Sequence, residues 1–257
     1  MFGFLIKKSF FDLWDNLFKV ALVNIGFIVS LLVPVYIPTL LTAVPLLGMG
    51  VLLIGILWCF VYLQAAALSL KALSDYGNFG FADFFSNLKS SWPAGLVFGA
   101  IAFLGYILLT IVMPFYFGWG SMIGLFLWAI ILWTVIVGIL AFLFFFAIRS
   151  RLDMKITKVI KKSFIIFFDN PLFCVSSFFL SLVILVLSLI TALLFPGPAG
   201  ILLFLDEGLR LRLLKYDWLD VNPDANRRKI PWDALLIDER EKTGTRSFKN
   251  FIFPWKD

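Results

Sequence analysis

The chain of 257 residues contains no histidine and only two cysteines, Cys59 and Cys174. It therefore lacks the commonest general base and the commonest metal ligand. Both cysteines lie within apolar stretches, which argues against a disulfide framework and against a metal site. The segment Gly118-Trp119-Gly120-Ser121 resembles a nucleophile turn, but it lacks the strand–turn–helix context and a base. We therefore predict that the protein is not an enzyme and has no catalytic residue, metal or cofactor.

Charge is also scarce, since only 15% of the residues are charged and 61% are hydrophobic, including 31 phenylalanines. Soluble domains have about 25% charged residues. Three stretches carry no charge at all, namely 20–70, 90–148 and 170–205, with lengths of 51, 59 and 36 residues. A membrane-spanning helix needs about 20 apolar residues, so each stretch has room for two helices and a turn. Proline and glycine occur near the middle of each stretch, where a turn is expected.

These patterns predict an all-α, polytopic membrane protein with six transmembrane helices arranged as three hairpins. The predicted transmembrane domain covers 1–215, with helices over about 19–38, 46–72, 94–115, 121–148, 171–195 and 199–215. Barrel strands would alternate in polarity, and these stretches do not. The remaining residues, 216–257, are predicted to form a cytoplasmic tail with a short helix that begins at Pro231 and stops before Gly244.

The distribution of charge predicts the orientation. All 22 lysines and arginines and all 16 acidic residues fall in the N-terminal segment, in alternate loops or in the last helix and tail. Because basic loops stay in the cytoplasm, we expect both termini to be cytoplasmic and the protein to reside in a bacterial inner membrane. Anionic lipid headgroups are sufficient partners for the basic face, and nucleic acid is not expected.

The chain repeats part of itself. Residues 6–10 recur as 160–164, and Asp15-Asn16 recurs as Asp169-Asn170, which makes seven identities in eleven positions. A weaker copy runs through Phe84 and its neighbours. Apolar and charged residues take opposite faces in the first copy, as in helices that lie in a membrane interface. We therefore predict an amphipathic interfacial helix before each hairpin.

The last predicted helix is the only one with charges inside it, which makes it the best site candidate. These residues are Asp206, Glu207, Arg210 and Arg212. In one interpretation they form a buried cluster that binds a partner or lines a cytoplasmic cavity. In the other, the helix is short or tilted and its charges reach the membrane interface.

Two weaker patterns concern the tail and the glycines. Basic and aromatic residues alternate near the C-terminus, which favours contact with a bilayer surface or a partner: Arg246, Phe248, Phe251, Phe253 and Trp255. The pairs Gly95–Gly99 and Gly120–Gly124 have the spacing that lets apolar helices approach closely. We expect the glycine pairs to pack within the protein, with dimerisation as the alternative.

Several segments resemble the YesL-like family of small bacterial membrane proteins. They are Ile37-Pro38-Thr39 with Ala43 after the first helix, and the run 84–89 before the third. The resemblance covers most of the membrane part and excludes the tail from Tyr216. The family defines no catalytic residues, and its genes often accompany carbohydrate importers. The resemblance therefore implies an accessory role beside a sugar permease.

We accordingly expect a non-catalytic accessory or assembly subunit of a larger bacterial inner-membrane complex, such as a carbohydrate importer. Its expected partners are the lipid bilayer, other membrane subunits and anionic lipid headgroups. The alternative is a small transport module that binds its own substrate, although the chain has few polar groups to hold one. A third hypothesis, lipid handling at the cytoplasmic leaflet, agrees with the abundance of phenylalanine.

Overall fold

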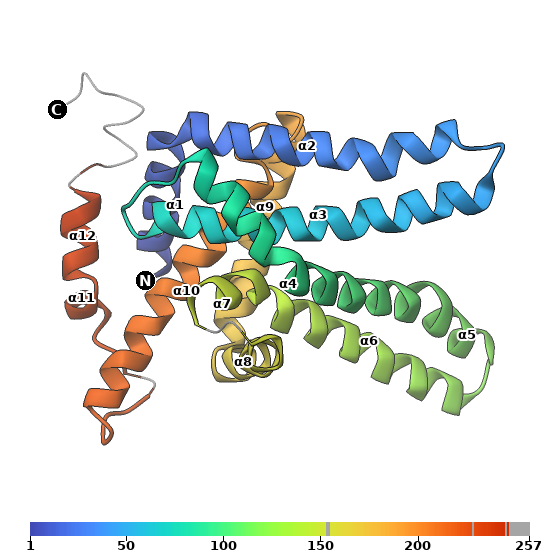
Figure 1. Ribbon diagram of the computed structural model, residues 1–257. Helices are drawn as coiled ribbons and strands as arrows, with labels where there is room; N and C mark the ends of the chain where they lie inside the picture. The colour runs from blue at the N-terminus through green and yellow to red at the C-terminus, as the bar shows by residue number, and fades with distance from the viewer. Residues whose placement is uncertain (153–154, 228, 245, 247–257) are drawn as a thin grey trace.

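The computed structural model describes residues 1–152, 155–227, 229–244 and 246, and within them every regular element is helical (Figure 1). The elements are α1 (Phe2–Asp15), α2 (Leu17–Leu40), α3 (Pro45–Ser74), α4 (Phe81–Ile107), the π-helical turn η1 (Leu108–Val112), α5 (Met113–Gly118), α6 (Met122–Phe142), α7 (Phe145–Arg151), α8 (Ile156–Asp169), α9 (Pro171–Ile190), α10 (Gly197–Val221), α11 (Trp232–Leu235) and α12 (Ile237–Thr243).

In the described part of the chain, five helical segments are long and apolar enough to cross a membrane, so the prediction of an all-α, multi-pass membrane protein is confirmed at this level. They are Leu17–Leu40, Pro45–Ser74, Phe81–Gly118, Met122–Arg151 and Pro171–Ile190. The sixth predicted span, 199–215, lies in α10, which is not among them. Charged residues interrupt α10 after Leu205, so only its first nine residues are free of charge. A sixth crossing therefore stays a prediction.

Helices α2 and α3 form a long arm, drawn in blue at the upper right of Figure 1. A hydrogen bond from the Tyr62 hydroxyl to the Val23 carbonyl, 2.8 Å long, joins them near the base. Further out, Gly55 faces the ring of Pro34 so closely that a Cβ would lie 2.8 Å from it. The missing side chain at Gly55 thus lets the two apolar helices pack along their length.

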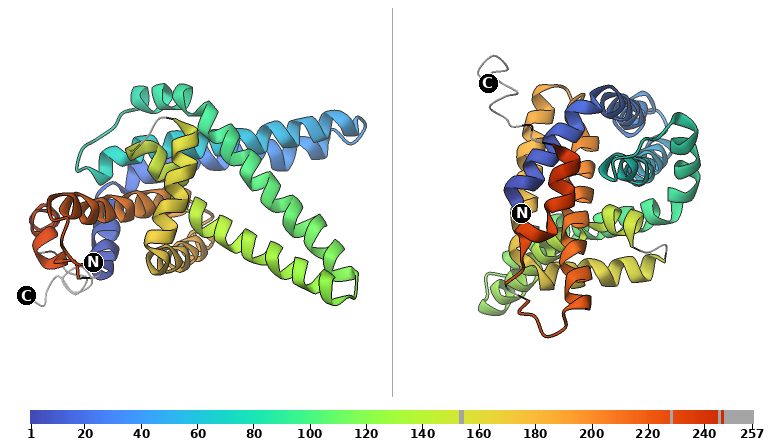
Figure 2. Two further views of the ribbon diagram at one scale, coloured as in Figure 1. Left: turned by 90° about the horizontal axis from the view of Figure 1, so that it is seen from below. Right: turned by 90° about the vertical axis from the view of Figure 1, so that its left-hand side faces the viewer.

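The second arm consists of α4, η1, α5 and α6. The predicted start of its first helix is wrong. The helix was expected to start near 94, after a separate interfacial helix, but α4 is continuous from Phe81. Pro93 lies inside it, and the first turns of α4 run at an angle to the rest (Figure 2). Proline can kink a helix without ending it. The middle amphipathic stretch is therefore the bent first part of a spanning helix.

The other two copies of the repeat are separate helices of 14 residues, α1 and α8. In both, the asparagine that ends the helix donates its side-chain N–H to the carbonyl four residues earlier, from Asn16 to Asp12 and from Asn170 to Ile166. An apolar helix follows immediately in each copy, α2 after α1 and α9 after α8. The sequence repeat thus corresponds to a repeated pair of helices.

Helix α10 lies at the centre, in contact with α1, α2, α3, α7 and α9. Leu203, Leu209 and Leu211 on α10 are buried in the main apolar core, together with Phe144. Helix α9 runs across the arms rather than along them, as the views in Figures 1 and 2 agree. The helices therefore do not form one parallel bundle. The short helices α11 and α12 occupy the region where the tail helix was predicted.

The glycine pairs pack within the chain. A Cβ on Gly95 would lie 2.5 Å from the Cα of Val61, and one on Gly99 would lie 2.6 Å from Leu57, so this pair brings α4 against α3. Gly120 has a φ of +61° and makes the turn after α5, while Gly124 faces the carbonyl of Tyr116 across that turn. The second pair therefore shapes a turn rather than a helix–helix contact.

Candidate functional site: a buried charge network

The first two charged residues of α10 lie inside the protein. Asp206 is 1% exposed and Glu207 is 0% exposed, although both are ionisable. Buried charges are rare unless they are paired. Of the two interpretations of the sequence, the structure agrees with a buried cluster, and the partners come from α1, α3, α7 and α12.

Asp206 pairs with Arg151 at the end of α7. The Arg151 guanidinium donates to both carboxylate oxygens, with the Nε contact at 2.8 Å. The same guanidinium donates to Asp75 over 2.9 Å and to the Ser74 hydroxyl over 2.7 Å. A planar guanidinium can serve several acceptors in this way. Arg151 therefore ties α7 to α10 and to the end of α3.

Glu207 faces α1. Its carboxylate accepts a hydrogen bond from the Ser9 hydroxyl, and its Oε1 lies 3.6 Å from Nζ of Lys8. Lys8 is 0% exposed and also pairs with Asp12 one turn further along α1. Burial alone would lower the pKa of Lys8, but the charges of Glu207 and Asp12 outweigh it and raise that pKa above its ordinary value. Lys8 is therefore held in its charged form.

Arg210 connects the network to the tail. Its guanidinium donates to Asp75 over 2.8 Å and to Glu239 of α12 over 2.7 Å. It also donates to the Ser74 carbonyl, which accepts from Lys8 over 3.3 Å as well. Ser74 is the last residue of α3, so these two cations lie at the negative end of its helix dipole. Both donate to the Ser74 carbonyl, one of the last carbonyls of the helix, which have no partner within it.

Arg212 takes a different environment. Its guanidinium lies over the ring of Phe173 at 4.4 Å and near that of Trp232 at 5.2 Å. Its Nε makes no hydrogen bond within the described part of the chain. Cation–π contact stabilises such a partly desolvated guanidinium. Arg212 therefore does not join the ion pairs of the other three residues.

A second, smaller group joins the far part of α10 to the α8–α9 junction. Lys215 donates to Asp169 over 2.8 Å and to the Asn170 side chain over 3.0 Å. The Tyr216 hydroxyl donates to Asp169 over 2.7 Å. Partial burial alone would raise the pKa of Asp169, but the hydrogen bonds from Lys215 and Tyr216 leave it below its ordinary value. The repeated Asp-Asn pair thus has a structural use in its second copy.

The tail residues singled out in the sequence can be placed only in part. Arg246 donates to the carboxylate of Asp15 at 2.8 Å and lies over the Phe11 ring at 4.9 Å. Phe248, Phe251, Phe253 and Trp255 lie outside the described residues.

The carboxylates of the network face cations. Within the described residues, Asp206, Glu207 and Glu239 each contact a cation, and no group of three or more Cys, Asp or Glu side chains could hold a metal ion. A general base needs a lone pair that can reach a substrate, whereas these carboxylates are directed at Arg151, Lys8 and Arg210. The chemistry that the cluster can perform is to hold helices together.

Several members of the network did not stand out in the sequence. In the sequence, Lys8 is one of several charged residues on one face of the first amphipathic helix, and Arg151 is one of six basic residues in a loop. Glu239 lies in a charged stretch of the tail with no distinctive spacing. Each is recruited from far along the chain. No local pattern could therefore identify these partners.

Comparison of the chain with protein-family models, with curated proteins and with solved structures gives no match. The resemblance to the YesL-like family stays a prediction.

Proposed function

We propose that this chain is a non-catalytic, multi-pass subunit that takes part in the assembly of a larger complex in a bacterial inner membrane, such as a solute importer for carbohydrates. The observation that carries the proposal is that the buried ionisable groups form ion pairs within the chain. The charged residues of α10 that sequence analysis put forward bind other helices of the same chain, so they hold a scaffold together instead of facing a substrate.

A scaffold of this kind needs surfaces for its partners, and the two arms supply them. Ile54 on α3 and Ile123 on α6 are each 68% exposed, and many apolar neighbours are exposed with them. Such faces suit lipid or the helices of another membrane subunit. We therefore assign partner contacts to the arms, and contacts with anionic headgroups to the lysines of α8.

The proposed orientation places both termini in the cytoplasm. It is supported by contacts between the two ends of the chain, since Lys7 donates to the Gly244 carbonyl over 3.3 Å and Arg246 pairs with Asp15. Segments in contact lie on the same side of a membrane, which requires an even number of crossings. We assign the sixth crossing to α10, which follows α9. Its apolar start enters the membrane, and the helix brings the chain back to the cytoplasmic side.

The experiment is site-specific photocrosslinking in the native membrane. A photoreactive amino acid at Ile54 or Ile123 should give a discrete, heavier adduct with a defined membrane protein, while one at the exposed loop residue Asp224 should not give that adduct. Purification in mild detergent should retain the same protein at fixed stoichiometry. A lone monomer without adducts at either arm would contradict the proposal.

The alternative function, a substrate-binding transport module, is favoured by one observation, which is a large cavity beside α6. The cavity wall is apolar, so it does not suit a sugar, whose hydroxyl groups need hydrogen-bond partners. Uptake of a labelled solute by proteoliposomes that contain only this chain would favour the transport module over the accessory subunit.

A further inference from the structure

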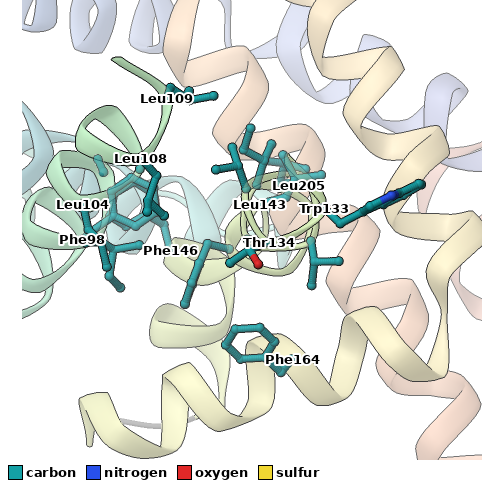
Figure 3. Close-up of a pocket in the computed structure, with 18 of the residues that line it drawn as sticks. Phe98, Leu104, Leu108, Leu109, Trp133, Thr134, Leu143, Phe146, Phe164 and Leu205 are labelled. Carbon is teal, nitrogen blue, oxygen red and sulfur yellow. The ribbon is translucent and has the colours of Figure 1, made fainter. Parts of the chain in front are cut away.

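A cavity of about 1070 Å³ opens between the two helices of the second arm. Figure 3 shows side chains from α4, η1, α6, α8 and α10 around it, among them Phe98, Leu108, Trp133, Phe164 and Leu205. Binding sites for small molecules have volumes of about 300–1,000 Å³, so the cavity is slightly larger than that range. Its lining does not include Asp206, Glu207 or Arg210.

The cavity exists because α4 and α6 diverge. They are joined through η1, α5 and the turn at Gly120, and Figure 2 shows them separating from that tip toward α8. Small residues widen the space, since a Cβ on Gly105 of α4 or on Gly138 of α6 would meet no atom within 4 Å. The space is open to the surroundings of the arm, since Trp133 in its wall is 65% exposed. What surrounds an apolar arm in a membrane is lipid.

Water is a poor occupant. The only polar side chains in the wall are those of Trp133 and Thr134. The Thr134 hydroxyl already donates to the Ile130 carbonyl over 2.8 Å. A buried water needs two to four polar partners, which this wall does not offer. The occupant must be apolar along most of its length.

Helix α8, which forms one wall of the cavity, carries positive charge. Phe164 of α8 lines the cavity, with its ring 5.3 Å from that of Phe142 at the end of α6. Lys161 lies three residues before Phe164, on the same side of the helix, and is exposed. Lys158 and Lys162 of α8, with Lys155 directly before it, make this region basic. An apolar cavity is thus bordered by a cationic helix.

We propose that the cavity binds an acyl chain of an anionic glycerophospholipid, whose headgroup lies against the lysines of α8. The apolar wall matches the chain, and the basic helix matches the phosphate. A partner's spanning helix is less suitable, because a cylinder about 10 Å wide and 30 Å long occupies more than roughly 2,000 Å³. This proposal does not depend on the accessory role of the protein.

The direct test uses the wild-type chain in vesicles that contain phosphatidylglycerol with a photoreactive group in its tail. Adducts should concentrate on cavity-lining peptides of α4, α6 and α8, and excess unlabelled phosphatidylglycerol should suppress them. Phosphatidylcholine with the same tail should label these peptides less. Adducts spread evenly over the exposed faces of α2, α3 and α9, without saturation, would overturn the proposal.

A matched pair of variants tests the cavity itself. In Gly138→Phe the new ring fills the cavity, whereas in Gly50→Phe on α3 it points into equally open space outside the cavity. Saturable labelling should fall about ten-fold or more in Gly138→Phe, as expected when a site is overpacked, and should not change in Gly50→Phe. Equal labelling of the two variants, or formation of a dimer that only Gly138→Phe abolishes, would count against a lipid occupant.

The headgroup is tested separately. Lys161→Gln should reduce the preference for phosphatidylglycerol over phosphatidylcholine by about five-fold, the effect of one lysine near an anionic surface. Labelling by phosphatidylcholine should stay the same. If Lys161→Gln leaves the preference unchanged, and simultaneous replacement of the three lysines of α8 also does so, the anionic headgroup is wrong.

Discussion

Lys8 shows how far a residue's surroundings can depart from what its local sequence indicates. It lies beside Lys7 in a short basic motif, yet it is fully buried between Asp12, Glu207 and the ring of Tyr76, 4.0 Å from its Nζ. Lys7 stays at the surface and reaches only the Gly244 carbonyl. The two lysines form a natural comparison between a buried and a surface cation.

Replacing Lys8 with methionine should destabilise the protein by about 3–5 kcal/mol, because Glu207 is left as a buried charge without its cation. Lys7→Met should change stability by less than about 0.5 kcal/mol. The buried thiols of Cys59 and Cys174 allow the measurement, since a thiol-reactive dye reports their exposure on heating. The double variant Lys8→Met/Glu207→Gln should recover part of the loss, and strict additivity would show that the two residues are not coupled.

Asp169 gives a prediction for acid conditions. Its pKa is lowered from an ordinary value of 3.8, so folding favours the charged carboxylate. Such a group stabilises the protein above its unfolded pKa, and the stabilisation disappears as the pH falls through the lower, folded value. At pH 7, Asp169→Asn should be less stable than wild type by about 1–2 kcal/mol.

The difference between Asp169→Asn and wild type should shrink below about pH 4 and vanish at lower pH. Thermal unfolding in detergent from pH 3 to 7 measures it. The exposed Asp224 supplies the control, since Asp224→Asn should follow wild type throughout. A gap between Asp169→Asn and wild type that is independent of pH would mean that the carboxylate charge is not what the site stabilises.

At the scale of elements, much of the helix pattern could be predicted, because long charge-free stretches and proline–glycine turns are local properties. The repeat also translated into structure, as α1–α2 and α8–α9. The predicted start of α4 was wrong because Pro93 lies within one continuous helix. The sequence pattern divided that helix into an interfacial helix and a spanning helix. The partners in the charge network could not be predicted, because ion pairs between Lys8 and Glu207 or Arg210 and Glu239 depend on tertiary packing.

The contact of α3 with α4 depends on Gly95. A Cβ there would lie 2.5 Å from backbone atoms of Val61, which cannot move without shifting α3. Gly95→Ala should therefore destabilise the protein by about 1–3 kcal/mol through overpacking. Gly105→Ala, on the same helix with open space around it, should be neutral or slightly stabilising because alanine favours the helix. Equal unfolding temperatures for the two variants would show that α3 and α4 do not pack this closely.

At the scale of the whole molecule, the contacts between the chain ends restrict the topology. Five segments can cross a membrane, but ends on one side require four or six crossings. The two arms supply four crossings. Whether the total is four or six therefore depends on α9 and α10. Helix α9 runs across the arms and α10 turns charged after Leu205, so this pair either completes a tilted third hairpin or enters and leaves from one side.

Accessible cysteines distinguish these two arrangements. In a chain whose Cys59 and Cys174 are replaced by alanine, a membrane-impermeant maleimide should label Thr42→Cys and Met122→Cys at the arm tips from outside intact cells. Gly3→Cys and Asp224→Cys should react only after permeabilisation if, as proposed, both ends of the chain are cytoplasmic. Ile190→Cys, 78% exposed at the end of α9, should react from outside if the third hairpin crosses. Reaction of Ile190→Cys only after permeabilisation would reduce the crossings to four, and the basic α8 would then lead into a hairpin that enters the bilayer from the cytoplasmic face.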